Sequence, residues 1–336
     1  MDIGVIGGGS WGTALAKLLA ENGHDVLVWC HEKPLPGVIN KEHENPEYLP
    51  GFRLPENLRA TNDLEEVVTG KEMIVSVVPS HVVRQVIEQV ADLIPPATPI
   101  VSATKGIENN TQMLVSDILE DVLPERCHPY LAYLSGPSFA REVADHKPTA
   151  VTIASFNHKL AERAQHVFSN SVFRCYTSTD VVGVEVGGAV KNVIAIAAGA
   201  VSGMDLGLNS MAGMITRGLH EMSRLAVRMG ANPLTLAGLA GMGDLVLTCT
   251  GGLSRNRSVG QKLGEGYSID EILGEMNMVA EGVKTSKSVH SLSQEIGVEM
   301  PICDQVYAVL YEDKPTRKVV ADLMARELKA EQQGLY

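Results

Sequence analysis

The sequence predicts an α/β protein in which an N-terminal doubly wound, mostly parallel sheet precedes an all-α C-terminal domain. Short apolar runs alternate with helical patterns in the first half of the 336 residues, and a glycine-rich turn follows the first run. From residue 181 onward the patterns are helical alone. The length suits two domains. We therefore expect one domain over residues 1–180 and a helical domain over residues 181–336.

The expected strands are short, β-branched and bounded by glycine, proline or polar turns, as buried parallel strands usually are. They cover residues 3–6, 26–29, 73–78, 100–103 and 130–134, and residues 150–154 and 172–175 extend the sheet. Helical patterns cover residues 10–22, 64–69, 81–93, 111–122 and 158–168. The alternation predicts right-handed crossovers with helices on both faces. Residues 31–60 contain five prolines and are expected to form a long excursion of the kind that often covers a ligand.

Glycines, rather than strands, interrupt the helical patterns of the second half. The expected helices cover residues 181–202, 210–229, a short segment after Pro233, 258–263, 270–276, 284–296, 303–311 and 317–329. No low-complexity linker precedes them, so the first long helix is expected to form the junction between the domains.

Charge and cysteine content exclude several classes of protein. The formal net charge is −12 and the pI about 5.3, which argues against binding nucleic acids or anionic membranes. Five scattered cysteines without a C-x-x-C pair predict reduced thiols and no zinc site or disulfide framework. The longest apolar stretch, residues 193–201, is too short to cross a bilayer. We expect a cytoplasmic protein without a membrane span, a nucleic-acid partner or a metal.

The glycine-rich turn fits the pattern G-x-G-x-x-G at Gly7, Gly9 and Gly12. A strand pattern precedes it and a helical pattern follows, which is the context of a Rossmann-like dinucleotide site. Gly7 permits the tight turn, Gly9 lets the backbone approach a pyrophosphate, and Gly12 lets helix and strand pack closely. The helix N-terminus would hold the pyrophosphate. The alternative is a glycine turn with a purely structural role.

The end of the second strand bears on the choice of nucleotide. NAD sites usually place an acidic residue there to hold the ribose hydroxyls. Here His31 follows the strand and Glu32 comes next. A non-acidic residue leaves room for a 2′-phosphate, so NADPH is favoured over NADH, although Glu32 could still reach a hydroxyl.

Lys191 is the most informative single residue, because it lies in an almost wholly apolar helical pattern. Gly187 and Gly188 precede it by one turn and Ala195 follows by one turn. Small side chains on that face would let a ligand reach the ammonium. The alternative is a lysine that extends from the helix surface into water.

A polar segment over residues 250–257 contains Ser254, Arg255 and Asn256. A glycine-rich loop of this composition before a helix suits phosphate binding, and a solvated basic loop is the alternative. Lys105 follows the fourth strand, and Gly136 and Ser138 follow the fifth. Open sheets bind ligands at these carboxyl ends.

Together, the motifs GGGSWGTALA, YLPG, TKGIE, SGPSFARE, VKNVIAIAAG, ITRG, GMGDLVLTC, SRNR and AEGVKTS resemble those of bacterial-type NAD(P)-dependent glycerol-3-phosphate dehydrogenase. The resemblance covers residues 2 to about 302. Two departures are minor: Asp145-His146-Lys147 stands where the family usually has a glycine, and Met242 stands where leucine is usual. The first could alter a surface turn.

The resemblance implies roles for individual residues. Lys191 would be the acid/base lysine, Lys105 a second lysine at the reacting end, and Asp244 a third catalytic group. Substrate contacts are implied at Lys105, Gly136, Ser138, Lys191, Asn192, Asp244, Thr248, Ser254, Arg255 and Asn256. Nucleotide contacts are implied at Ser10, Trp11, His31, Lys105, Ala140, Arg255, Val279 and Glu281, in addition to the glycines of the turn.

The implied reaction interconverts glycerol 3-phosphate and dihydroxyacetone phosphate, which supplies glycerol 3-phosphate for glycerophospholipid synthesis. Lys191 would donate a proton in reduction and accept one in oxidation. Lys105 and the apolar helix should lower the pKa of Lys191, whereas Asp244 should oppose that and orient the ammonium. Two ammonium groups can polarise a carbonyl without a metal. A homodimer is a family-level expectation.

Two other functions fit part of the pattern. A related two-domain dehydrogenase of a 3-hydroxyacid or a sugar acid would use a helix lysine but has no need of the Ser254–Arg257 segment. A nucleotide-binding sensor without turnover would have little reason to combine Lys191, Asp244 and Arg255.

Overall fold

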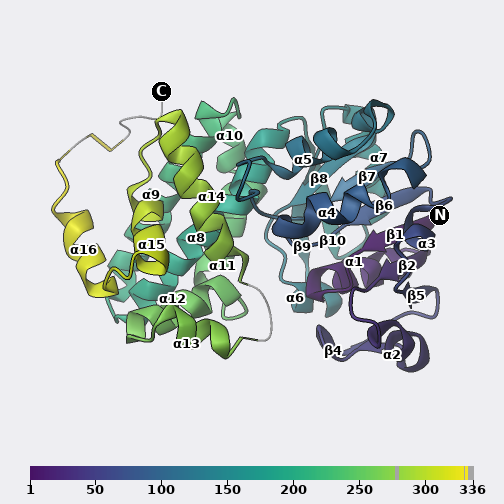
Figure 1. Cartoon of the computed structure of the whole chain (residues 1–336), viewed down its shortest axis with the longest axis horizontal. Coiled ribbons are helices and arrows are strands. Elements are labelled where there is room, and N and C mark those ends of the chain that lie inside the picture. The colour runs from purple at the N-terminus through teal and green to yellow at the C-terminus, as the bar shows by residue number, and fades with distance from the viewer. Residues whose placement is uncertain (277–279, 329, 332–336) are drawn as a thin grey trace. The chain divides into compact units, whose positions relative to one another are not determined.

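The computed structural model describes residues 1–276, 280–328 and 330–331, and these form two compact units whose elements are labelled in Figure 1. Unit 1 contains Met1–Thr104 and Val115–Val181. Unit 2 contains Lys105–Leu114 and the described residues from Val182 onward. The predicted fold class is confirmed: a mostly parallel sheet with interleaved helices comes first, and helices alone follow.

Unit 1 is built on one eight-stranded sheet with the order β10-β9-β8-β7-β6-β1-β2-β5. Its strands are β1 (Asp2–Ile6), β2 (Asp25–Trp29), β5 (Leu58–Thr61), β6 (Met73–Ser76), β7 (Ile100–Ser102), β8 (Leu131–Ser135), β9 (Thr149–Ala154) and β10 (Phe173–Ser178). All neighbouring strands are parallel except β8 and β9, which are antiparallel. The two runs expected to extend the sheet do so as β9 and β10.

Helices cover both faces of this sheet. Every residue of β6 and β8 is buried, and because successive residues point to opposite faces, both faces must be covered. The helices of unit 1 are α1 (Ser10–Glu21), α2 (Leu35–Glu42), α3 (Leu64–Val68), α4 (Val83–Glu88), α5 (Val115–Val122), α6 (Ala140–Ala144) and α7 (His158–Phe168). The helix expected over residues 81–93 is shorter, because 3₁₀ turns replace its two ends.

Residues 31–60, which were expected to form a long excursion after the second strand, contain regular elements that the sequence pattern did not predict. This segment contains α2, the two-stranded sheet of β3 (Glu44–Asn45) and β4 (Leu49–Arg53), and most of β5. β5 is the edge strand beside β2. Asn40 on α2 stabilises it, since its amide accepts the Ala60 N–H at 2.7 Å and donates to the Ala60 carbonyl at 2.8 Å. The side chain thus replaces the missing neighbouring strand.

From Val182 onward, the described residues of unit 2 form helices and the loops that connect them, without a strand. Its helices are α8 (Val181–Gly203), α9 (Gly207–Arg228), α10 (Pro233–Leu236), α11 (Asp244–Thr250), α12 (Arg255–Glu265), α13 (Ile269–Gly274), α14 (Glu281–Ile296), α15 (Pro301–Tyr311) and α16 (Thr316–Met324). A π-helical turn, η4 (Leu239–Gly243), leads into α11. The last helix ends five residues earlier than the sequence pattern predicts.

The apolar helix α8 forms the core of this unit. By length and composition alone, α8 and the stretch Pro233–Thr250 could each cross a membrane. However, 89% of the most apolar window of α8 is buried inside the protein. The second stretch is divided among α10, η4 and α11, and it contains the buried carboxylate of Asp244. We interpret α8 as a core helix.

Helices α8 and α12 approach each other at backbone distance. A Cβ atom added to Gly199 would lie 2.0 Å from the Arg257 carbonyl oxygen, and one added to Gly260 would lie 1.8 Å from the Ile196 carbonyl oxygen. Neither position can therefore accept a side chain without moving the other helix. This contact sets the separation between the helix that carries Lys191 and the helix that begins at Arg255.

Candidate active site

The glycine turn of unit 1 has the geometry of an anion site. Gly7 adopts φ +123°, which side chains rarely tolerate, and a Cβ on Gly12 would lie 1.8 Å from the Gly7 carbonyl oxygen. A Cβ on Gly9 would meet nothing within 4 Å, so the backbone is open to a ligand there. Gly9 caps α1 without a side-chain hydrogen bond, and the first turn contains no acidic residue. The free N–H groups and the helix dipole favour an anion.

Two residues beside this turn differ in how they could serve a nucleotide. The Nε1 of Trp11 is buried and has no hydrogen-bond partner, which is an unusual state for an indole N–H. The hydroxyl of Ser10 donates to the Tyr48 carbonyl oxygen at 2.6 Å, so that interaction competes with a ligand. The open turn and the unsatisfied donor fit the nucleotide expected here.

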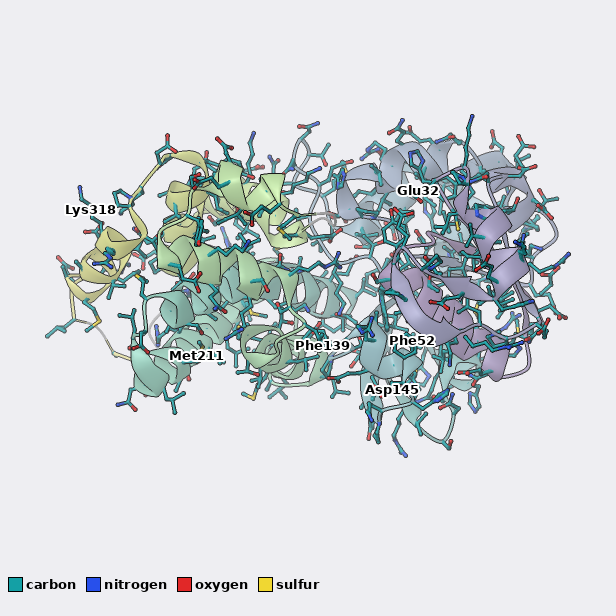
Figure 2. All side chains as sticks on the ribbon, turned by 90° about the horizontal axis from the view of Figure 1, so that it is seen from below. Glu32, Phe52, Phe139, Asp145, Met211 and Lys318 are labelled. Atoms are coloured by element: carbon teal, nitrogen blue, oxygen red, sulfur yellow. The ribbon has the colours of Figure 1, made fainter. Side chains whose placement is uncertain are left out.

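Two polar residues, His31 and Glu32, follow the end of β2. His31 is exposed and its ring lies edge-on to Trp29, with 5.9 Å between the centroids. Glu32, which is labelled in Figure 2, is partly exposed, and its Oε1 accepts a hydrogen bond from the Tyr48 hydroxyl at 2.7 Å. Burial, followed by this contact with Glu32, raises the pKa of Tyr48. Glu32 is therefore already engaged by a neutral donor, whereas His31 faces solvent.

The residues after β8 form a tight turn in unit 1. A Cβ on Gly136 would lie 2.9 Å from the Val151 Cα. The Ser138 hydroxyl donates to the Gly136 carbonyl oxygen at 3.0 Å, and Ala140 begins α6. His146, in the segment that departs from the family pattern, adopts a left-handed φ of +56°. Its Nε2 lies 3.0 Å from the Glu21 carboxylate on α1. This contact helps to stabilise a left-handed backbone conformation that glycine adopts without steric strain.

In unit 2, Asp244 binds two lysines at once. The Lys191 Nζ donates to Oδ1 and the Lys105 Nζ donates to Oδ2, each at 2.7 Å. The Lys191 ammonium also donates to the Thr248 hydroxyl at 2.8 Å, and that hydroxyl donates to the Asp244 carbonyl oxygen at 2.6 Å. Lys191 is 6% exposed and Asp244 is 1% exposed. All three residues predicted to be catalytic thus form one cluster, in which Lys191 and Asp244 are buried and the Lys105 side chain is 16% exposed.

The electrostatics of the cluster agree with the expectation from sequence. The pKa of Lys191 is lowered to about 8, chiefly by burial; Asp244 raises it against this effect, and the positive charge of Lys105 adds to the lowering. An amine with this pKa exists in both protonation states near neutral pH. Lys191 can therefore donate and accept a proton under physiological conditions.

Gly187, on the small-residue face of α8, serves the packing of η4, so at this position the face is not open to a ligand. A Cβ on Gly187 would lie 2.5 Å from the Ala240 carbonyl oxygen of η4. The missing side chain lets the π-helical turn pack directly on α8. That contact brings Asp244, the residue after η4, within hydrogen-bonding distance of Lys191. π-helical turns are frequently found at functional sites.

A second hydrogen-bonded chain joins α8, α12 and α14. The Asn256 amide donates to the Asn192 Oδ1 at 2.9 Å and accepts the Gly282 N–H at 2.9 Å. A Cβ on Gly282 would lie 2.5 Å from the Asn192 carbonyl oxygen. The sequence prediction missed Gly282 as a residue of this site. A glycine in the first turn of an expected helix is the signal that could have revealed it.

The expected phosphate loop is the start of a helix. Ser254 is the N-cap of α12 and its hydroxyl accepts the Arg257 N–H at 3.2 Å, so Arg255 and Asn256 lie in the first helical turn. The first turn contains no acidic residue, and a helix N-terminus favours an anion. Partial burial lowers the pKa of Arg255, and the charge of Glu281 raises it. The residue is nevertheless exposed to solvent, and its guanidinium remains a cation. Val279 lies outside the described residues.

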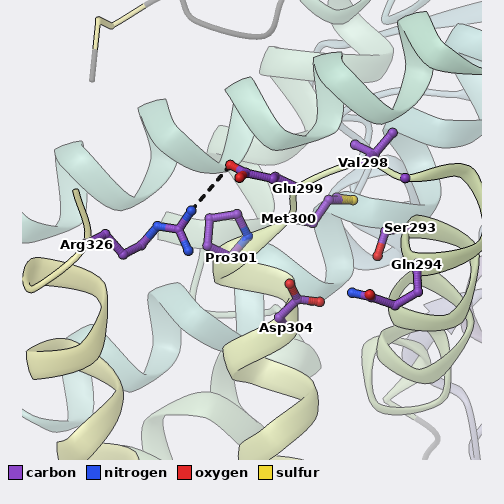
Figure 3. A pocket seen from close by; sticks show the side chains of 9 residues that line it. Ser293, Gln294, Val298, Glu299, Met300, Pro301, Asp304 and Arg326 are labelled. Atoms are coloured by element: carbon purple, nitrogen blue, oxygen red, sulfur yellow. Dashed lines mark hydrogen bonds and ion pairs between the residues drawn. The ribbon is translucent and has the colours of Figure 1, made fainter. Parts of the chain in front are cut away.

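A hollow of about 230 Å³ lies elsewhere in unit 2, lined by residues between Ser293 and Asp304 and by Arg326. Figure 3 shows Arg326 extending toward Glu299, with which it forms an ion pair at 3.3 Å. None of the described site residues lines this hollow.

Within the described parts of the chain, no group of three or more His, Cys, Asp or Glu side chains could hold a metal ion.

A parallel sheet with an anion-binding turn after β1, together with a helical unit that buries a paired lysine, defines the class of nicotinamide-nucleotide dehydrogenases. Two sequence profiles match the chain. The N-terminal profile of NAD-dependent glycerol-3-phosphate dehydrogenase covers residues 2–161, and the C-terminal profile covers residues 180–321. The chain belongs to the glycerol-3-phosphate dehydrogenase family.

Individual relatives agree with this assignment. A glycerol-3-phosphate dehydrogenase of Myxococcus xanthus is 55% identical over 98% of this chain and 99% of its own length. The crystal structure of glycerol-3-phosphate dehydrogenase from Coxiella burnetii is 40% identical, with a TM-score of 0.92 over 97% of this chain and 99% of that one. The Saccharomyces cerevisiae enzyme is 29% identical, with a TM-score of 0.81 over the same two shares.

Proposed function

We propose that this protein interconverts sn-glycerol 3-phosphate and dihydroxyacetone phosphate with NADP(H) or NAD(H). Its family membership supports the reaction class. The observation that carries the mechanism is the buried pair of Lys191 and Asp244, with the pKa of Lys191 at about 8 and a second ammonium on the same carboxylate. When bound, the nicotinamide supplies a hydride to C2 of the ketone or takes one from C2 of the alcohol.

Lys191 moves the proton that accompanies this hydride. In reduction it donates to the oxygen at C2, and in oxidation it accepts the hydroxyl proton. Asp244 and Thr248 hold the ammonium in a fixed direction through hydrogen bonds of 2.7 and 2.8 Å. This orientation reduces the entropy that would be lost on reaching the transition state.

Lys105 and Asp244 adjust the electrostatics of the reacting oxygen. The Lys105 ammonium places a second positive charge on the carboxylate that binds Lys191, and this charge stabilises negative charge that develops on the C2 oxygen. Asp244 balances the two cations, which lowers the cost of burying the ammonium of Lys191. Asn192 and Asn256 lie in the second hydrogen-bonded chain, where they can bind substrate hydroxyl groups.

The start of α12 holds the substrate phosphate. Arg255 supplies a guanidinium, and the backbone N–H groups of the first turn add further donors. A protein of net charge −12 needs such a placed cation for an anionic substrate. Ser254, as the N-cap, retains a hydroxyl proton that it can donate to a phosphate oxygen.

The glycine turn, Ser10, Trp11 and Ala140 hold the dinucleotide, with Gly136 and Ser138 at the substrate end. Exposed His31 and the engaged carboxylate of Glu32 favour NADPH over NADH. Val279 and Glu281 complete the proposed nucleotide contacts. In the cell the reaction would supply glycerol 3-phosphate for glycerophospholipid synthesis in the cytoplasm, by a protein that we propose is a homodimer. The proposed functional division is a nucleotide domain over residues 1–180 and a substrate domain over residues 181–336.

A spectrophotometric assay at 340 nm tests the activity. Purified protein should oxidise NADPH when dihydroxyacetone phosphate is added, and far more slowly with a 3-ketoacid that lacks phosphate. Faster turnover of the ketoacid would support the related 3-hydroxyacid dehydrogenases instead. Tight nucleotide binding without turnover of either substrate would support a sensor.

A further inference from the structure

One short segment of the chain belongs to unit 2 although its sequence neighbours on both sides belong to unit 1. This is Lys105–Leu114, which follows β7 and precedes α5. It closes on itself as a turn, because the Glu108 N–H donates to the Met113 carbonyl oxygen at 3.0 Å and the Gln112 N–H donates to the Glu108 carbonyl oxygen at 3.0 Å. Lys105, the second lysine on Asp244, is its first residue.

Apolar contacts and a buried hydroxyl attach this segment to the helical unit. Ile107 and Leu114 are each 2% exposed and belong to the apolar core that contains α8. Ser288 on α14 is fully buried, and its hydroxyl lies 2.9 Å from the Ile107 carbonyl oxygen and 2.5 Å from the Asn109 Oδ1. The hydroxyl donates to one of these oxygens, and a reversed Asn109 amide would allow it to accept from the other.

We propose that Ser288 is a positioning residue that fixes the Lys105 segment on α14 and thereby keeps the Lys105 ammonium on Asp244. Ile107 is two residues from Lys105, so the backbone that carries the lysine cannot shift without breaking the hydrogen bond from Ser288. Removing the hydroxyl leaves a buried carbonyl oxygen without that donor, and a buried unsatisfied group favours movement of the segment. This inference rests on the proposed role of Lys191 in proton transfer.

The position of Lys105 has a consequence that can be measured at Lys191. The titratable groups that act on Lys191 are Asp244, Lys105 and Cys249, and among them Lys105 is the like charge that lowers the pKa of Lys191. If Lys105 withdraws, this repulsion weakens and the pKa of Lys191 rises. The limb of the pH–rate profile that reports Lys191 then moves to higher pH in both directions of the reaction.

Four variants of the full-length protein test the inference: Ser288→Ala, Lys105→Met, the double variant, and the control Ser293→Ala. Ser293 lies on the same helix and is 1% exposed, but its hydroxyl donates to the His290 carbonyl of its own helix. We expect Ser288→Ala to lower kcat/KM by about 10- to 100-fold. It should also shift the Lys191 limb upward by about 0.5 to 1 pH unit, toward the Lys105→Met profile.

Non-additivity is the decisive outcome. In the Lys105→Met background, Ser288→Ala should have little further effect on kcat/KM or on the limb, because the group that it positions is gone. Ser293→Ala should leave the limb in place. If Ser288→Ala is too unstable to purify, Ser288→Cys keeps a similar side-chain size with a weaker donor and should give an intermediate shift.

The outcomes separate this inference from the proposed function. A lower melting temperature with an unshifted limb, or full additivity with Lys105→Met, overturns the role of Ser288 and leaves that of Lys191 intact. Near-normal turnover of a Lys191→Ala variant overturns both.

Discussion

The ammonium of Lys191 lies 2.7 Å from the Oδ1 of Asp244, and both groups are buried. Of the charged neighbours of Lys191, Asp244 is the one that most raises its pKa, against the stronger effect of burial. Among its charged neighbours, this carboxylate is therefore the main group that favours the protonated form of the lysine.

Asp244→Asn keeps the size of the side chain and removes its charge. We expect the pKa of Lys191 to fall below about 8, because burial and Lys105 then act without opposition. The limb of kcat/KM that reports Lys191 should move to lower pH, opposite to the shift expected for Ser288→Ala. A pH series from 5.5 to 10 measures it, and an unchanged limb would show that Asp244 does not act on the titrating group.

Lys191→Ala removes the proposed proton donor. We expect kcat to fall by roughly 10²–10⁴-fold, the usual contribution of a general acid or base, while NADPH affinity measured by fluorescence titration changes little. A matched control is Lys17→Ala, which removes a buried lysine of unit 1 that pairs with Glu21. Loss of activity equal in both variants would indicate a folding defect rather than lost chemistry.

His31→Asp should change the nucleotide preference. The new carboxylate would repel a 2′-phosphate and could accept a hydrogen bond from a ribose hydroxyl, so NADPH should bind more weakly and NADH more strongly. Wild type should bind NADPH at least as well as NADH. Titration of both nucleotides into both proteins tests this, and a wild-type preference for NADH would count against the role of His31.

Arg255→Ala should weaken the handling of the phosphate. A charge-assisted hydrogen bond to a partly desolvated phosphate contributes about 1.5–3 kcal/mol, so kcat/KM should fall by roughly 10- to 150-fold. Arg255→Lys should restore only part, because it lacks the bidentate fork.

Dihydroxyacetone, which has no phosphate, provides the control for Arg255. Wild type should have a very low kcat/KM with dihydroxyacetone, and Arg255→Ala should lower this value little further. An equal loss with both substrates would mean that Arg255 serves another purpose, such as holding the nucleotide.

Glu221 should make stability depend on pH. Its carboxylate, buried on α9, accepts the N–H groups of Ile302 and Cys303 at 2.8 and 3.2 Å, yet burial raises its pKa from 4.5 to about 7. Because the folded-state pKa is the higher one, the favourable contribution is complete below pH 4.5 and is lost as pH rises toward 7. The total is on the order of 3 kcal/mol. Glu221→Gln should remove this dependence, as urea unfolding of both proteins between pH 5 and 8 can measure. Parallel curves would contradict the assignment.

The sequence was sufficient to predict elements with a strong apolar pattern. It predicted less well the elements whose position or boundary depends on polar contacts. β1, β6 and α8 consist mostly of apolar residues and were predicted from that pattern. β5 was missed because residues 58–61 are short and mixed in polarity, and their edge is satisfied by Asn40 from another element. The start of α12 was placed too late because Ser254, Arg255 and Asn256 are polar, although Ser254 is a common type of N-cap.

The sequence likewise predicts some features of the candidate site and not others. Motif order identified Lys105, Lys191 and Asp244, but no spacing in the sequence indicates that one carboxylate binds both ammonium groups. That depends on the packing of η4 against Gly187, which is a three-dimensional contact. Ser288 gave no signal, because a serine inside an amphipathic helix is unremarkable until its acceptor is known.

The contribution of residues 105–114 to unit 2 limits how this enzyme can be divided or recombined. A fragment that begins at residue 182 would carry Lys191, Asp244 and Arg255 and would still lack Lys105. If the C-terminal half is exchanged between relatives, Asp244 comes from one protein and the lysine that pairs with it at position 105 comes from the other. A chimera should retain activity when the 105–114 segment is exchanged together with the helical half, and should lose part of it when the crossover separates the two.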